Sequence, residues 1–130
     1  MFQLQEIKQA HSKVKSGADF PVYVQALVKL GVKKYDTYVN DGHTVYHGAN
    51  NYQVQTAAQY ALLTVANTGN AEKFIHYLKI HQQGQTDYPA FCRHAAETGV
   101  EKWTVDMSLL TCTYYDKANN TMLEEKIPVP

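Results

Sequence analysis

Two histidines four residues apart, His43 and His47, are the first residues of this sequence that could bind a metal ion. The spacing brings the two side chains close together only if the segment is helical. The segment TVY between them follows the turn pair DG and favours a β-strand, in which four residues span about 13 Å. Zinc holds histidine nitrogens at about 2.0–2.1 Å, so we expect no metal site and no other cofactor.

The two cysteines, Cys92 and Cys112, could serve a redox or nucleophilic function. They do not form a Cys-x-x-Cys pair, and a catalytic thiol needs a lowered pKa and a neighbouring base. Cys112 lies between two threonines in a predicted strand, and Cys92 falls on the apolar stripe of a predicted helix. We therefore expect both thiols to be reduced, buried and inert.

Tyrosine is the remaining residue type that suggests binding, with ten copies in 130 residues. Tyrosine combines apolar area with a polar tip and is enriched where proteins bind partners. Its abundance also fits an ordinary sheet, because strands favour aromatic residues. The candidate ligand-binding or partner-binding residues are His43, Tyr46, His47, Asp106, Tyr114 and Tyr115.

The elements that must position these residues follow from the hydrophobic period and from the turn signals. Helical spacing predicts helices over residues 3–16, 19–31, 70–83 and 87–99. A period of two predicts strands over residues 35–39, 43–47, 52–56, 102–107, 109–115 and 121–127. The apolar segment YALLTVA, residues 60–66, is too short for a helix before the break at NTGN and is predicted to be a strand.

The chain also repeats itself with a shift of 68 residues. Six positions in residues 19–48 recur without a gap, and several of them are a helix cap, a first-turn proline or a helix-ending glycine. The matching pairs are Asp19 and Asp87, Pro21 and Pro89, Gly31 and Gly99, Val32 and Val100, Lys34 and Lys102, and Tyr46 and Tyr114. We predict one α+β domain, residues 1–130, in which two similar helix-helix-strand-strand-strand halves, about 1–66 and 67–130, form an antiparallel sheet covered by helices.

Composition excludes several classes of partner. Twelve basic and twelve acidic residues give a formal charge of zero, whereas a domain that binds nucleic acid usually carries a basic excess. The longest apolar segment is far too short to span a bilayer, and the first residues do not resemble a signal peptide. We therefore expect a cytoplasmic protein that binds neither nucleic acid nor membrane.

The second half of the sequence resembles a known family. The motifs HQQGQTDYPAFC, GVEKW and TCTYYD, between His81 and Pro128, are similar to those of small uncharacterised bacterial proteins. Some members of that family are labelled "phage envelope protein". The resemblance implies no activity, substrate or catalytic residue, and the label implies at most an association with prophages.

Two functions remain open from the sequence. The first is a non-catalytic cytosolic binding or interaction protein, whose partner is a protein or a small molecule and which could form a homodimer. The alternative is a small-molecule enzyme that uses a surface of tyrosine, histidine and aspartate, with Asp106, His43 and Tyr114 as acid–base groups. A concave pocket that shifts the pKa values of its residues would favour the enzyme.

Overall fold

The computed structural model describes residues 2–15 and 19–129 and has the predicted α+β architecture. The helices are α1 (Leu4–His11), α2 (Phe20–Leu30), α3 (Ala71–Gln82) and α4 (Tyr88–Glu97), with a short 3₁₀ helix, η2 (Ala49–Asn51). The strands are β1 (Lys34–Tyr38), β2 (Thr44–His47), β3 (Gln53–Gln55), β4 (Lys102–Asp106), β5 (Thr111–Tyr115) and β6 (Thr121–Lys126).

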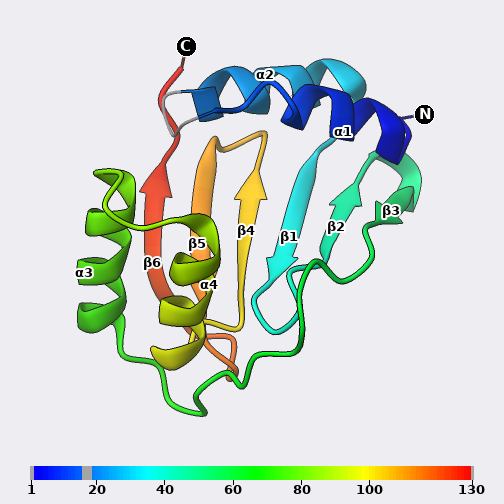
Figure 1. The fold of residues 1–130 in the computed structure, drawn as a ribbon. Helices are drawn as coiled ribbons and strands as arrows, with labels where there is room; N and C mark the ends of the chain where they lie inside the picture. Colours follow the sequence, from blue (N-terminus) through cyan, green and yellow to red (C-terminus); the bar gives the residue numbers. More distant parts are fainter. Residues whose placement is uncertain (1, 16–18, 130) are drawn as a thin grey trace.

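The six strands form one antiparallel sheet in the order β3-β2-β1-β4-β5-β6 (Figure 1). Each half of the chain contributes two helices and then three strands, and the first strands of the halves, β1 and β4, pair at the centre. The middle of that pairing is Asp36 opposite Thr104, two residues that the shift of 68 also matches. The strand order and register therefore have two-fold symmetry.

The helices do not follow this symmetry in their orientation. α1 and α2 run across one end of the sheet, whereas α3 and α4 lie along the side formed by β5 and β6 (Figure 1). The turn residues that end the second helix of each half do agree with the repeat. Gly31 and Gly99 both have positive φ, 100° and 86°, which L side chains rarely adopt.

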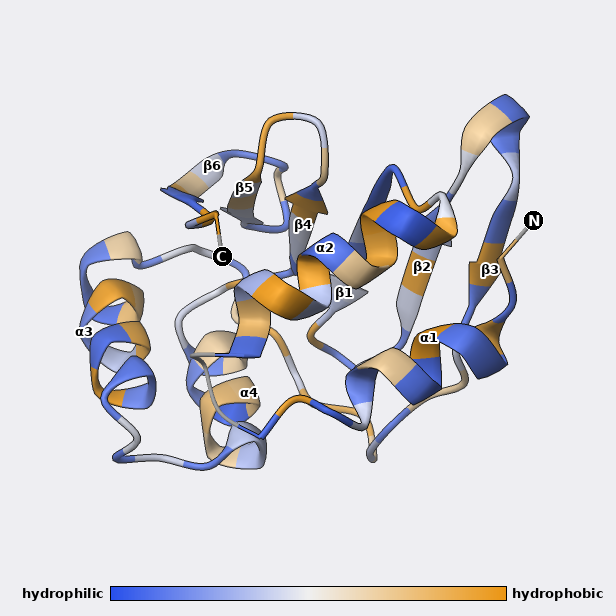
Figure 2. Cartoon of the chain, turned by 90° about the horizontal axis from the view of Figure 1, so that it is seen from above, coloured by the Kyte–Doolittle hydropathy of each residue, from blue (hydrophilic) through white to orange (hydrophobic). Residues whose placement is uncertain are grey.

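α3 and α4 lie against one side of the sheet, and α2 crosses the ends of the strands in the view from above (Figure 2). Tyr23 of α2 meets Tyr46 on that same side of the sheet. Because side chains alternate along a strand, one face of the sheet points into the core beneath the helices. The buried strand residues of this covered face are Tyr35, Thr37, Thr44, Tyr46, Trp103, Val105, Cys112 and Tyr114. Phe74, Leu78, Phe91, Ala95, Val24 and Leu27 meet them from the helices.

None of the described helices covers the opposite face, which we call the open face. The strand registers place sixteen side chains on it: Lys34, Asp36, Tyr38, Val45, His47, Gln53, Gln55, Lys102, Thr104, Asp106, Thr111, Thr113, Tyr115, Thr121, Glu124 and Lys126. This face is polar, whereas the covered face is aromatic and aliphatic. Such alternation is typical of an antiparallel sheet with one buried face.

The strand predicted at residues 60–66 is wrong. The chain from Thr56 to Gly69 contains no helix or strand and crosses one end of the sheet, and we call it the strap. Its amides donate to the first hairpin: Gln59 and Tyr60 N–H donate to the Asp41 carbonyl, and Leu63 N–H donates to Asn40. These backbone groups are therefore satisfied by a turn, and no neighbouring strand is required.

Two element boundaries also differ from the prediction. The first helix ends at His11, four residues after its only buried side chain, Ile7, and its expected end at residues 16–17 lies outside the described residues. β5 begins at Thr111, because Leu109 and Leu110 form the turn from β4 and Leu110 has a φ of 52°. A residue with positive φ does not continue a strand.

Candidate functional site

A carboxylate, an imidazole and a hydroxyl meet at the centre of the open face. His47 Nε2 lies 3.1 Å from Asp36 Oδ2, and Thr104 Oγ1 donates to Asp36 Oδ1. Asp36 is buried between its neighbours on β2 and β4, while His47 remains partly exposed. The network joins three strands and places one imidazole edge toward solvent.

A second feature of the open face is a row of stacked side chains around Tyr38, the last residue of β1. Lys102 Nζ lies 5.9 Å from the ring centroid of Tyr38 and 5.5 Å from that of Tyr115. On the other side of Tyr38, the His43 ring stacks at 4.6 Å with an interplanar angle of 5°. Because strand side chains stand roughly perpendicular to the sheet, this row presents polar tips outward.

Partial burial and hydrogen bonding shift the pKa values of two residues in and beside this row. The pKa of Tyr38 is raised, first by partial burial and then by the Asp36 and Glu101 carboxylates. The pKa of Asp41 is lowered, chiefly because its carboxylate accepts the backbone N–H of His43, and it also contacts His43 Nδ1. The Tyr38 phenol therefore remains a hydrogen-bond donor at neutral pH.

The six residues predicted as a binding site lie on both sides of the sheet. His47, Asp106 and Tyr115 are on the open face, and His43 lies at the hairpin end beside Tyr38. Tyr46 and Tyr114, each 7% exposed, point into the core. The structure therefore brings four of the six to the open side and separates the other two from them.

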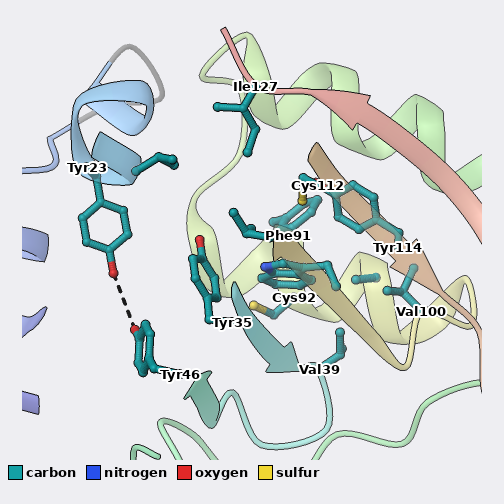
Figure 3. Close-up of a cluster of buried hydrophobic side chains, with 14 of the residues drawn as sticks. Tyr23, Tyr35, Val39, Tyr46, Phe91, Cys92, Val100, Cys112, Tyr114 and Ile127 are labelled. Atoms are coloured by element: carbon teal, nitrogen blue, oxygen red, sulfur yellow. Dashed lines mark hydrogen bonds between the residues drawn. The ribbon is translucent and has the colours of Figure 1, made fainter. Parts of the chain in front are cut away.

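The core tyrosines form a cluster of phenols beneath α2 and α4 (Figure 3). The Tyr46 hydroxyl lies 3.5 Å from that of Tyr23, and Tyr114 packs its ring against Phe74 at 4.8 Å. Burial raises the pKa of Tyr46 and of Tyr114. These phenols stay neutral, and their contacts are those of core residues.

The acid–base set considered for an enzyme does not converge. Asp106 is opposite Lys34 at one end of β1, and its carboxylate accepts the N–H groups of Ser108 and Leu109. His43 is beside Tyr38 at the other end of β1, about 13 Å away along the strand. Tyr114 lies on the covered face.

Both cysteines are free and buried, as predicted. Burial raises the pKa of Cys112 to about 12 and also raises that of Cys92. A thiol with a raised pKa is a poor nucleophile at neutral pH.

The described residues contain no group of three or more His, Cys, Asp or Glu side chains that could hold a metal ion. No described helix is long and apolar enough to cross a membrane. Two shallow hollows lie between α1 and α2, and both include Ala10, Lys13 and Ala26 in their walls. None of the six candidate residues lines either hollow.

Sequence reasoning missed Asp36, Thr104, Tyr38 and Lys102. Their alternation with buried residues placed them on the polar side of predicted strands, which was the available signal. Their proximity depends on the antiparallel register of β1 and β4, between which the chain forms β2, η2, β3, the strap, α3 and α4. No local pattern specifies that register.

Fold and site together define a class: an α+β protein whose antiparallel sheet is covered by helices on one face and carries polar side chains on the other. The chain belongs to the family described as "Protein of unknown function (DUF1398)", whose model matches residues 8–126. No protein in the curated set matches the chain.

Proposed function

We propose that this is a non-catalytic cytosolic binding protein that contacts a protein partner through the open face. The observation that supports it is the combination of the Asp36, His47 and Thr104 network with the row of Tyr38, Lys102 and Tyr115 on a face that the described helices leave uncovered. These side chains offer donors and acceptors in fixed positions.

The charge of the face favours a protein over a polyanion. Its three lysines, Lys34, Lys102 and Lys126, are matched by three carboxylates, Asp36, Asp106 and Glu124. Phosphate polymers are bound by surfaces with a basic excess, whereas protein interfaces are enriched in tyrosine and need no excess of either charge. The face therefore suits a partner that presents both charges.

Co-purification from the native host tests the proposal. The tagged wild type and the open-face variant Lys102→Glu are isolated in parallel, and the proteins retained with each are quantified by mass spectrometry. We expect a specific species with the wild type that is depleted about tenfold or more by the variant, because charge reversal breaks the row at its centre.

A matched control is Lys79→Glu, the same substitution at an exposed residue of α3 on the helical side. It should retain the species at the wild-type level. A species lost equally from both variants, or retained by both, contradicts binding through the open face.

The alternative function, a small-molecule enzyme, is favoured by one observation: the pair of Asp36 and His47 resembles the carboxylate–imidazole pair of a general base. The pair has no hydroxyl beside it that could act as a nucleophile among the described contacts, because the Thr104 hydroxyl donates its proton to Asp36. His47→Gln tests it: a turnover found by metabolite screening of the wild type and abolished in this variant would favour the enzyme.

The cytosolic location and the prophage association belong to the same proposal. Two free thiols support a reducing compartment. The prophage association is supported only by the similarity of residues 81–128 to proteins with a phage label. Fractionation of host cells tests the location, and the position of the gene relative to phage genes tests the association.

A further inference from the structure

Resting on the proposed function, we infer that the partner of the open face is a second copy of this chain. The two open faces pack against each other about a two-fold axis that runs parallel to the strands, above the boundary between β1 and β4. The product is a two-layer sandwich of sheets with the helices outside.

The antiparallel register of β1 and β4 determines which residues of the two copies face each other in this dimer. A rotation of 180° about an axis parallel to the strands keeps every residue at its height and exchanges β1 with β4. Each β1 residue therefore lies opposite the partner's copy of its own cross-strand neighbour. Packed sheets are about 10 Å apart, a separation that long polar side chains can bridge.

The three central pairs are complementary in this arrangement. Lys34 lies opposite the partner's Asp106, which is an ion pair. Tyr38 lies opposite the partner's Lys102, and Asp36 lies opposite the partner's Thr104. Symmetry doubles the first two contacts, so the centre of the interface contains four favourable contacts, two of opposite charge and two of cation with ring. The Asp36 and Thr104 pairs between them bring no like charges together, because each Thr104 hydroxyl already donates to Asp36 of its own chain.

The outer strands bring no like charges together. β2 lies over β5 of the second copy, so His47 is opposite the partner's Thr111. β3 lies over β6, which places Gln53 opposite the partner's Lys126 and Gln55 opposite the partner's Glu124. Amide side chains can donate to the carboxylate and accept from the ammonium group.

The other simple two-fold arrangement is disfavoured. An axis in the plane of the faces but perpendicular to the strands, at the height of the central pair, places Asp36 opposite the partner's Asp36. Two carboxylates that face each other at an interface repel and disfavour association. Charge complementarity therefore selects the axis parallel to the strands.

Two charge-reversal variants test the self-pairing. Light scattering after size exclusion should give the wild type a mass twice that of the 14.7 kDa chain. Lys34→Glu places two carboxylates opposite each other, and Asp106→Lys places two ammonium groups opposite each other, so each variant alone should dimerise at least about tenfold more weakly. An equimolar mixture should restore a dimer, because both facing pairs are then of opposite charge.

Folding is checked separately, because Asp106 also accepts backbone hydrogen bonds in its turn. If Asp106→Lys does not fold, Lys102→Glu serves as a second variant: it removes the cation opposite the partner's Tyr38 and should weaken the dimer. Lys79→Glu on α3 is the control and should leave the dimer intact. Raising the salt concentration should also weaken it, since the pairs are ionic.

A monomeric wild type at micromolar concentration overturns the self-pairing. A dimer that survives both charge reversals, or variants that fail to combine, overturns it equally. The co-purification experiment is independent of these results, because a monomer can still retain a different protein that Lys102→Glu releases. The two proposals therefore fail separately.

Discussion

At the scale of single residues, adjacent tyrosines have different environments. Tyr114 points into the core, where its ring packs with Phe74 and Trp103, and Tyr115 points to the open face beside Lys102. The alternation of strand side chains contains this distinction, because Tyr114 shares a register with the apolar Cys112. The predicted binding site grouped Tyr46, Tyr114 and Tyr115 by residue type and therefore mixed two core residues with one residue of the open face.

The alternation of side chains along β4 also determines the environment of Trp103. Its ring faces the helices with Val105 and Met107, is 9% exposed, and lies 5.8 Å from the ring of Phe91 on α4. Trp103→Ala should lower the free energy of unfolding by about 3–5 kcal/mol, because it removes a buried aromatic side chain from between helix and sheet. A denaturant titration measures this change.

Leu62→Ala is the comparison for Trp103→Ala. Leu62 is 77% exposed in the strap, so its truncation should change the free energy of unfolding by no more than about 0.5 kcal/mol. If the two variants unfold at the same denaturant concentration, the ring of Trp103 does not stabilise the core.

The two thiols give a second prediction at this scale. At pH 8, an aromatic disulfide reagent should label Cys92 and Cys112 of the native protein at least about a hundredfold more slowly than in denaturant, since both are buried and protonated. Ser108→Cys, in an exposed turn, provides a fast-labelling reference in the same fold. Native labelling at the rate of the reference would contradict burial.

At the scale of elements, the strap shows where sequence reasoning reaches its limit. Residues 60–66 have the apolar run of a buried strand, and Val65 is indeed buried. The strap differs from a strand in where its hydrogen bonds go. The N–H of Leu63 donates to the carbonyl of Asn40 in a turn, and the side-chain hydroxyl of Tyr60 donates to the carbonyl of Val39. A partner twenty residues away leaves no local signal, whereas caps and turn glycines do.

The packing of the strap can be tested at Gly99. A Cβ added there would lie 2.6 Å from the carbonyl oxygen of Thr68 and 2.7 Å from the Cα of Gly69, both backbone atoms. Gly99→Ala therefore combines a left-handed conformation, which costs about 1–2 kcal/mol, with a clash that requires the strap to move. We expect the thermal midpoint to fall by more than about 10 °C.

Gly84 separates the two effects of that substitution. Its φ is also positive, 78°, but an added Cβ has no neighbour within 4 Å. Gly84→Ala should therefore show only the conformational cost of about 1–2 kcal/mol. Equal destabilisation by both substitutions would mean that the strap does not press against Gly99.

At the scale of the whole molecule, the repeat gave the two halves and their element order but not how they join. The shift of 68 residues is compatible with either a parallel or an antiparallel pairing of the two first strands. The antiparallel register makes Asp36 and Thr104 neighbours and leaves one face of six strands that none of the helices among residues 2–15 and 19–129 covers. The open face is therefore a property of the assembled sheet, which no single segment encodes.

The buried phenols should make the free energy of unfolding of the whole molecule fall at alkaline pH. Burial raises the pKa of the following tyrosines above its ordinary value near 10: Tyr23, Tyr35, Tyr46, Tyr60 and Tyr114. In the unfolded chain these phenols lose their protons near pH 10, while the folded chain retains them. The unfolded state then binds fewer protons, so the free energy of unfolding falls as pH rises.

We therefore expect stability to be fully present below about pH 9 and to be lost steeply above pH 10, by about 1.4 kcal/mol per pH unit for each phenol that titrates only on unfolding. Denaturant midpoints measured from pH 8 to pH 11 test this, with tyrosinate absorbance recorded in parallel. Tyr35→Phe removes one buried phenol and should make the decline shallower, whatever its effect at neutral pH. A midpoint that stays constant to pH 11, with tyrosinate already formed in the folded protein, would show that these hydroxyls are open to solvent and that the helices do not seal the covered face.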